Sequence, residues 1–433
     1  MKNKLSLILL VVTLLLLGFV FAENFFSGLL WKWVFAAVFC VAGIWIFHGK
    51  VKEYSFSKSF LILVFLLVIF IPFAGKKQNI SLENRKLAPF PEWRWSNIWQ
   101  FFFQYQVYFD DRFAYRNELV AAVNKIKIKI FHKSAIPDQV AIGDEDWLYM
   151  ARKDYIVATS RPFTEQQLDT VILNLEVITR FFDSKGMKFY FMMLPVKERI
   201  YPEFLPELQR VEMKISKMDQ LYARLINNKV IRSIDCKQEL LNGKKVKDTY
   251  YKPDTHWNMF GAYLGYRKLI ARLNADFPEL QAHNPEDYQV DSVMQYEGDL
   301  QKMMGFVDVF QMKSYTYKLK SGIEAETISF KNPKYPNAHF STKQMPERVS
   351  GLRLYLVRDS FSEHLKVFLT AHFDYSALAW MPVLPVNEIL AVSPNLVVHE
   401  IHELFANHLL KLPDEILQDT VFVKNYQKTY KIK

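Results

Sequence analysis

Three long apolar runs near the N-terminus constrain the fold of this 433-residue chain more than any other feature. Residues 5–22, 29–47 and 59–75 contain one charged side chain between them, Lys32, which stands between two tryptophans near the end of its run. A helix needs roughly 20 apolar residues to cross a bilayer, and Lys and Trp are tolerated at its ends. The first run alone could be a secretory signal peptide, but it is longer than the apolar part of such peptides and two more runs follow. The sequence therefore predicts three transmembrane helices within residues 1–75.

The lysines around these runs predict how the chain is oriented. None lies in the first short loop; they stand before the first run and in the second loop, as Lys2, Lys4, Lys50, Lys52 and Lys58. Loops rich in Lys and Arg stay on the cytoplasmic side. Three crossings then place everything after residue 75 outside the cytoplasm.

The charge balance limits the classes of partner. A formal net charge of +10 favours anionic partners such as phospholipid headgroups or acidic polysaccharide. The chain has no zinc-finger spacing and no basic run interleaved with aromatic residues, so we expect no nucleic-acid partner. The two cysteines, Cys40 and Cys236, lie in different regions and cannot form a disulfide within the extracytoplasmic part.

Residues 76–410 have the composition of a globular domain in which strands and helices alternate. Thr164 and Gln167 form a capping-box pattern before a helix, and Gly186 stands where that helix would end. A buried-type strand over residues 188–194 follows, and a later strand over 352–357 leads into a helix. This alternation predicts an α/β sandwich with a mainly parallel sheet. Residues 278–351 are less regular and are interpreted as insertions, and the basic residues 411–433 are expected to form a solvated tail.

Two short strings carry residues that could do chemistry. In "PDTHWN", Asp254 and His256 would project to the same side of an extended segment, where a carboxylate can orient an imidazole, and Asn258 could cap the next helix. In "RDSF", Ser360 follows the strand at 352–357, and ligands of open α/β sheets bind at the carboxyl ends of strands. A serine there also lies near free backbone N–H groups that can stabilise an oxyanion. The simpler alternative is that Ser360 only caps a helix.

A metal site is the other chemical alternative. The string "HEIHE" supplies His399, His402 and Glu403, which Asp254 and His256 could join as ligands. The second histidine comes one residue too early for the zinc motif HExxH, and no recognised ligand spacing is met. We therefore predict neither a metal nor a cofactor.

Six strings in order give the chain a resemblance to a known family. They are "ENRKLAPFPE", "YFDDRFAYRNEL", "LPVKERIYPEFLP", "DTHWNMFGAY", "GDLQKMMG" and "RDSF". With them the chain resembles the AlgX/AlgJ-type polysaccharide O-acetyltransferases, whose SGNH hydrolase-like domain also occurs in DHHW-motif proteins. The resemblance implies a three-layer SGNH hydrolase-like sandwich.

The resemblance also implies residue roles. Asp254, His256 and Ser360 would form the catalytic triad, with the Asp and His before the Ser. Lys197 and Gly298 match recurrent family strings and are expected to line the site. Arg358 replaces the Gly of the family's G-D-S form, which alters the turn before the serine, and we include it among the expected substrate-binding residues.

The function implied is O-acetylation of an exported or cell-surface polysaccharide through an acetyl-serine intermediate. The protein would lie in a bacterial cytoplasmic membrane, with its catalytic domain periplasmic or at the cell surface and a membrane-bound O-acyltransferase supplying acetyl groups. Two alternatives remain at this point: a carbohydrate acetylesterase with the same triad, and a non-catalytic subunit that binds glycan.

Overall fold

The computed structural model describes residues 79, 86–93, 95–212, 216–295, 298–322, 324–331, 339–380 and 383–430. Every element named below belongs to one compact unit, Gln78–Arg112 with Arg116–Lys433. The three predicted transmembrane helices lie outside the described residues. Among the helices of the described ranges, none combines the length and the apolar character that crossing a membrane requires.

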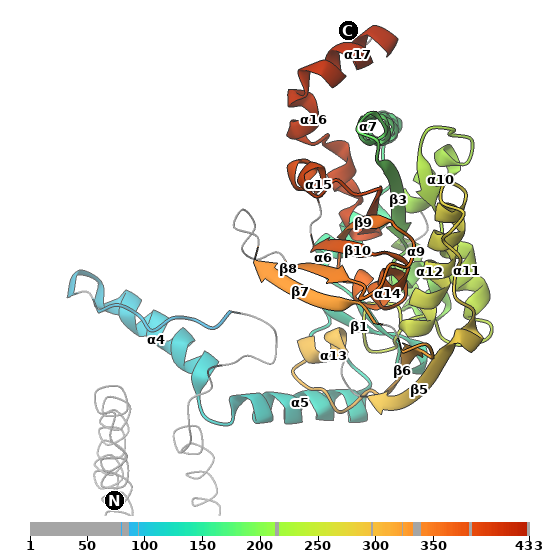
Figure 1. Cartoon of the computed structure of the whole chain (residues 1–433). Coiled ribbons are helices and arrows are strands. Elements are labelled where there is room, and N and C mark those ends of the chain that lie inside the picture. The colour runs from blue at the N-terminus through green and yellow to red at the C-terminus, as the bar shows by residue number, and fades with distance from the viewer. Residues whose placement is uncertain are drawn as a thin grey trace, which may run out of the picture. The chain divides into compact units, whose positions relative to one another are not determined.

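A seven-stranded mixed sheet forms the centre of this unit (Figure 1). In spatial order its strands are β4 (Arg232–Ile234), β3 (Lys188–Leu194), β11 (Leu396–His402), β9 (Arg353–Arg358), β10 (Tyr375–Trp380), β8 (His339–Gln344) and β7 (Glu326–Lys331). The first five strands pair in parallel, as the alternation of strand and helix predicts. The hairpin of β7 and β8 adds two antiparallel strands at one edge. This hairpin lies within residues 278–351, which we interpreted as insertions. Its strands are short and rich in polar residues, so the sequence pattern did not reveal them.

Helices cover both faces of the sheet, which gives the predicted three layers. Alternation along β9 turns Leu354 and Leu356 toward one core and Tyr355 and Val357 toward the other. The first core is closed by α11 (Lys237–Gly243), α12 (Met259–Asn274) and α14 (Ser362–Leu369). The second core is closed by α7 (Glu165–Ser184), α10 (Lys217–Leu225) and α15 (Val386–Val392). The predicted SGNH hydrolase-like α/β architecture is therefore present.

Capping residues determine where the helices around the site begin and end. The Thr164 side chain accepts from the Gln167 backbone N–H while the Gln167 side chain accepts from that of Thr164, so the predicted capping box begins α7. Gly186 follows its end at φ +78°, a conformation that favours glycine. Asn258 accepts from the N–H of Gly261 and so caps α12, which fixes the end of the loop that carries Asp254 and His256.

Smaller elements surround the sandwich. They are η3 (Trp95–Asn97), α4 (Ile98–Arg112), α5 (Arg116–Phe131), β1 (Val140–Ile142), η4 (Asp144–Asp146), β2 (Leu148–Met150), α6 (Lys153–Ser160), α8 (Lys197–Ile200), η5 (Pro202–Phe204), α9 (Glu207–Glu212), η6 (Pro285–Asp287), β5 (Tyr288–Gln295), α13 (Asp299–Met303), β6 (Met312–Leu319), η7 (Thr370–His372), η8 (Glu403–Leu410), α16 (Asp414–Gln418) and α17 (Thr420–Tyr430). Strands β5 and β6 form a separate antiparallel pair, as do β1 and β2.

The end of the chain is not simply the solvated tail that we expected. Ile416 of α16 is fully buried, and the Phe422 ring of α17 packs edge-on against Phe181 of α7, with centroids 5.2 Å apart. These apolar side chains stand among the lysines and hold the segment against the second core. The expectation of a solvated end was therefore wrong up to at least Phe422.

Candidate active site

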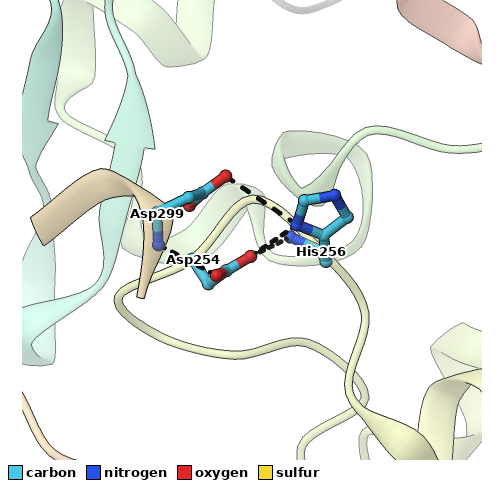
Figure 2. Close-up of side chains that lie close together, drawn as sticks. All are labelled: Asp254, His256 and Asp299. Atoms are coloured by element: carbon cyan, nitrogen blue, oxygen red, sulfur yellow. Dashed lines mark hydrogen bonds and ion pairs between the residues drawn. The ribbon is translucent and has the colours of Figure 1, made fainter. Parts of the chain in front are cut away.

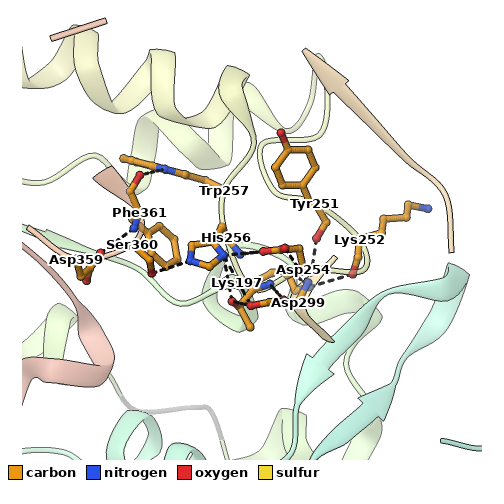
Figure 3. A network of polar contacts seen from close by, with 11 residues as sticks. Lys197, Tyr251, Lys252, Asp254, His256, Trp257, Asp299, Asp359, Ser360 and Phe361 are labelled. Atoms are coloured by element: carbon orange, nitrogen blue, oxygen red, sulfur yellow. Dashed lines mark hydrogen bonds and ion pairs between the residues drawn. The ribbon is translucent and has the colours of Figure 1, made fainter. Parts of the chain in front are cut away.

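The structure brings Ser360, His256 and Asp254 together (Figure 3). His256 Nε2 lies 2.7 Å from Ser360 Oγ, and His256 Nδ1 lies 2.7 Å from Asp254 Oδ1. Ser360 comes two residues after β9 ends, at the carboxyl edge of the parallel strands, whereas His256 and Asp254 come from the loop before α12. Two segments about a hundred positions apart in sequence thus form one hydrogen-bonded chain from serine to imidazole to carboxylate.

The loop holds its acid and its imidazole by a turn and not by an extended segment. Asp254 Oδ1 accepts from the backbone N–H of His256 at 2.8 Å as well as contacting the ring nitrogen of the same residue. Such a contact two residues along the chain is typical of an aspartate that begins a turn. The side chains meet as predicted, but the extended geometry from which we predicted their meeting is wrong.

Asp299 is a second carboxylate beside the imidazole, and sequence reasoning missed it. Its Oδ2 lies 3.8 Å from His256 Nδ1 (Figure 2), and its Oδ1 accepts from the N–H of Thr255 at 2.8 Å. Its own backbone N–H donates to Asp254 Oδ2 at 2.9 Å, so α13 begins against the catalytic loop. The string "GDL" at residues 298–300 was expected to line the site, but it gave Asp299 no role of its own.

The charges of this cluster are strongly coupled. Burial alone would raise the pKa of Asp254, but hydrogen bonds from His256 and the charge of its imidazolium hold that pKa at about 2. Burial alone would lower the pKa of His256, but the hydrogen bond and the negative charge of Asp254 raise it to about 9. Burial and the nearby charge of Asp254 raise the pKa of Asp299 to about 6. The site therefore favours a protonated imidazole beside an ionised Asp254.

The turn that carries the serine is fixed by buried groups. Asp359 Oδ1 accepts from the N–H of Phe361 at 2.9 Å, and its Oδ2 accepts from the N–H of His402 at 2.6 Å. The simpler alternative for Ser360 does not hold, because α14 begins at Ser362 and its capping position is Phe361, which makes no side-chain cap. The Ser360 hydroxyl is therefore available to His256 and is not used to cap the helix.

Lys197 and Gly298 both contact the backbone of the loop that carries Asp254 and His256. Lys197 is buried, and its Nζ donates to the carbonyl oxygens of Tyr251, Lys252 and Asp254, the last at 2.6 Å. Burial lowers the pKa of Lys197 to about 8, although nearby acidic groups oppose that shift. A Cβ at Gly298 would lie 2.2 Å from the carbonyl oxygen of Pro253, so only glycine lets α13 begin this close to the loop.

Arg358 is the last residue of β9 and is also buried. Its Nη1 lies 2.6 Å from Glu363 Oε1 and donates to the carbonyl of Asp359 at 3.1 Å, while its guanidinium lies over the ring of Trp380. Arg358 therefore braces the serine turn from the strand side, where the family's glycine has no side chain. Substrate contact by Lys197, Gly298 or Arg358 stays a prediction, and the observed contacts support a positioning role.

The geometry speaks against the "HEIHE" metal alternative. His399 and His402 lie on opposite faces of β11: His399 packs against Phe191 in the second core, and His402 stacks on Phe361 at 4.5 Å on the side of the serine. Within the described residues, Asp254, His256 and Asp299 offer ligand atoms within 4.8 Å of one another. Both ring nitrogens of His256 are already within hydrogen-bond distance of Asp254 and Ser360, which is the arrangement of a triad.

A sheet with five parallel strands, covered by helices on both faces and carrying a serine after the central strand β9, fits the class of SGNH hydrolase-like domains. Residues 140–376 match the family described as "SGNH hydrolase-like domain, acetyltransferase AlgX". The match spans more than half of the chain, and the chain belongs to this family.

Two curated relatives are similar to the chain in sequence, and a solved structure is similar to it in fold. The chain is 24% identical over 217 residues to "Probable alginate O-acetylase AlgJ" of Pseudomonas fluorescens, which is 49% of this chain and 52% of the relative. It is 22% identical over 197 residues to the protein of the same name from Pseudomonas syringae pv. tomato, 45% of this chain and 48% of the relative. The chain thus spans about half the length of these relatives. Bacillus cereus PatB1 superposes with a TM-score of 0.50 at 14% identity, over 63% of this chain and 99% of that one, and shows the fold alone.

Proposed function

We propose that this protein is an O-acetyltransferase that acts on an exported or cell-surface polysaccharide. The observation that carries the proposal is the contact of 2.7 Å between Ser360 Oγ and His256 Nε2, with Asp254 at the other ring nitrogen. Serine is a weak nucleophile unless an adjacent base removes its proton and an acid orients that base. The family to which the chain belongs supports the choice of acetyl transfer.

The first half of the reaction loads the enzyme. Neutral His256, with its proton on Nδ1 facing Asp254, takes the hydroxyl proton of Ser360 as Oγ attacks the carbonyl carbon of an acetyl donor. The tetrahedral intermediate collapses, the donor's alkoxide leaves with the proton from His256, and acetyl-serine remains. Asp254 stabilises the imidazolium that exists between these two proton transfers.

The second half transfers the acetyl group. A sugar hydroxyl gives its proton to His256 Nε2 as its oxygen attacks the carbonyl of acetyl-Ser360. The intermediate then releases Ser360, which recovers its proton from the imidazolium, and the product is an acetylated sugar. An acetylesterase would follow the same steps with water in place of the sugar, so the two activities differ only in which hydroxyl reaches the acyl-enzyme.

The acceptor that we propose is an acidic polysaccharide of the alginate type. Two curated relatives carry alginate O-acetylase in their names, and the net charge of +10 favours an anionic polymer. The third possibility, a subunit without catalysis, finds less support, since a decayed site would not be expected to keep the serine and the imidazole in hydrogen-bond contact.

The acetyl donor and the location follow from the predicted topology. A catalytic domain outside the cytoplasm has no acetyl-CoA beside it, so acetyl groups must cross the membrane. We propose that a membrane-bound O-acyltransferase supplies them and that residues 1–75 anchor the chain in the bacterial cytoplasmic membrane beside it. No soluble cofactor is needed for either half-reaction.

The proposal is tested with the full-length protein in detergent, a small activated acetyl ester and an oligouronate acceptor. We expect the peptide that contains Ser360 to gain the mass of one acetyl group, and the acceptor to be acetylated faster than the ester is hydrolysed. The Ser360→Ala variant should fold normally and show neither product. An acetylated peptide elsewhere, or full activity in Ser360→Ala, would remove Ser360 as nucleophile, and release of acetate alone would identify an esterase.

A further inference from the structure

Helix α5 has two different apolar faces, and only one of them is covered by the domain. On the covered face Asn124 and Ile128 are buried; the Asn124 side-chain amide donates to the carbonyl of Met304 at 2.6 Å. Ile128 packs in a core cluster with Leu300 of α13 and with Phe306. These contacts hold this face of α5 against the domain.

The opposite face of α5 is apolar and exposed. Leu119, Val123, Ile126 and Ile130 recur at intervals of four, three and four residues and are between 44% and 65% exposed. At about 100° per residue these four side chains form one stripe, turned away from Asn124 and Ile128. A soluble domain rarely exposes so continuous an apolar stripe unless something else covers it.

Lysines border this stripe. Lys127 and Lys129 are exposed and project on either side of it, while Lys125 forms an ion pair with Asp308 of the domain at 2.6 Å. Apolar side chains in a stripe with cations along both edges are typical of helices that lie in the surface of an anionic bilayer. A buried protein interface would instead have to remove the water of these ammonium groups, which is unfavourable without acidic partners.

Helix α4 carries a second exposed stripe, and it is aromatic. Trp99, Phe102, Phe103 and Val107 share one side of the helix, with Trp99 81% and Phe103 69% exposed, and Trp95 just before the helix is 83% exposed. Tryptophan is enriched at the interface between bilayer and water, where its ring is apolar and its N–H is hydrated. Helix α4 begins at Ile98 and the last predicted transmembrane run ends at residue 75, so the predicted topology would allow α4 to reach the bilayer.

We propose that the exposed faces of α4 and α5 bind the lipid headgroup region of an anionic membrane. The apolar stripes enter the boundary between headgroups and acyl chains, and the bordering lysines contact lipid phosphates. This is a binding surface for lipid and not a part of the acetyl-transfer site, so it stands independently of the proposed function.

The surface also positions the candidate active site. Helix α5 packs on α13, and Asp299, the first residue of α13, reaches the catalytic loop. Because α13 is five residues long, about 8 Å of helix lies between the contact with α5 and the cluster around His256. A membrane-bound α5 would thus keep that cluster close to the bilayer surface.

The test uses full-length protein in lipid nanodiscs of phosphatidylethanolamine and phosphatidylglycerol. A Cys40→Ser background leaves Cys236, which is buried, and single cysteines at Phe103, Ile130 or Val246 receive an environment-sensitive fluorophore. Val246 is the matched control, since it is 84% exposed and lies after α11. Nitroxide-labelled lipid reports contact with the bilayer, and iodide reports contact with water.

We expect labels at Phe103 and Ile130 to be quenched by the nitroxide lipid several-fold more than the label at Val246, and to be protected from iodide. Replacing phosphatidylglycerol by a zwitterionic lipid should weaken the lipid quenching at Ile130. Iodide access equal to that of Val246 would show that the stripes face water. Protection from both quenchers would show that another protein or a second copy covers them. Either result overturns the proposal, and each label is at an exposed side chain whose replacement does not disturb the core.

Discussion

The substitution Asp254→Asn isolates what the carboxylate does for the imidazole. In the structure Asp254 Oδ1 lies 2.7 Å from His256 Nδ1, and this contact is the main reason that the pKa of His256 is raised to about 9 despite burial. Asparagine keeps the shape of the side chain and removes its charge. It can also present its N–H₂ group to Nδ1, which would favour the wrong tautomer of the ring.

The structure gives the scale of the expected loss. A pKa of about 9 in place of the ordinary 6.5 corresponds to roughly 3 kcal/mol of preference for the imidazolium, which is also the state that forms when Ser360 attacks. Above about pH 9, where His256 is neutral before Ser360 attacks, losing that preference slows the reaction by roughly 10²- to 10³-fold. An unfavourable tautomer adds to this, so at that pH we expect kcat/KM to fall between about 10²- and 10⁴-fold.

The pH dependence of activity tests the role of Asp254 independently of the size of the rate loss. His256 must be neutral to accept the proton of Ser360, so the activity of the natural protein should rise with pH and level off above about 9. Without the charge of Asp254 the imidazolium is less stable, and the rising limb should move to lower pH. The same pKa means that this contact stabilises the fold fully below about 6.5 and that its contribution is lost as pH rises through about 9.

The assay is hydrolysis of a small acetyl ester by full-length protein from pH 5 to 10. The matched control is Asp299→Asn, since Asp299 Oδ2 is 3.8 Å from the same nitrogen and makes no hydrogen bond with it. In Asp299→Asn the rising limb of the pH–activity profile should also move to lower pH, but by less. A limb for Asp254→Asn that stayed in place or moved to higher pH would refute the assigned role of the carboxylate, and a larger effect of Asp299→Asn would transfer that role to Asp299.

Three further substitutions test the supports of the site. Gly298→Ala should lower stability by about 1–3 kcal/mol and reduce kcat, because the added methyl would lie 2.2 Å from the carbonyl of Pro253; thermal melting and ester hydrolysis measure the two effects. Lys197→Met should reduce kcat about tenfold or more with little change in KM, because the loop that carries Asp254 loses its buried donor, and Lys197→Arg should not restore the rate. Trp257→Phe should cost about 0.5–1.5 kcal/mol, which chemical denaturation measures, because the carbonyl of Phe361 loses its indole donor and keeps the longer hydrogen bond from the N–H of His364 at 3.3 Å. If any of these variants kept the stability and the rate of the natural protein, the supporting role assigned to that residue would be wrong.

The sequence drew attention to Asp254, His256 and Ser360 because each stands at the boundary of a strongly patterned element, and the family resemblance then implied their roles as a triad. Ser360 follows a strand whose apolar run is continuous, and Asn258 marks where the next helix begins just after His256. Both boundaries are local features, set by hydrophobic pattern and by capping. The capping box at Thr164 and the buried strand of residues 188–194 were predicted for the same reason.

The resemblance pointed to Lys197 and Gly298, but the contacts by which the supports hold the site could not be predicted, because no local pattern encodes them. Asp299 reaches Asp254 through its backbone N–H, and Lys197 binds carbonyl oxygens that every residue type possesses. The distance between Gly298 and the Pro253 carbonyl likewise depends on how two distant loops meet. The hairpin of β7 and β8 was missed because short, polar strands acquire their place only by pairing with an existing sheet edge.

The distance between serine and imidazole is set by buried neighbours and not by the two catalytic groups themselves. Trp257, which follows His256, is fully buried and donates its indole N–H to the carbonyl of Phe361, which follows Ser360, at 2.9 Å. The Phe361 ring in turn packs against the imidazole of His256, with centroids 4.9 Å apart. A displacement of one catalytic segment must therefore carry the other with it. Since the base and the nucleophile are held in position before any substrate arrives, the choice between a sugar hydroxyl and water depends on which of them reaches the half-buried Ser360.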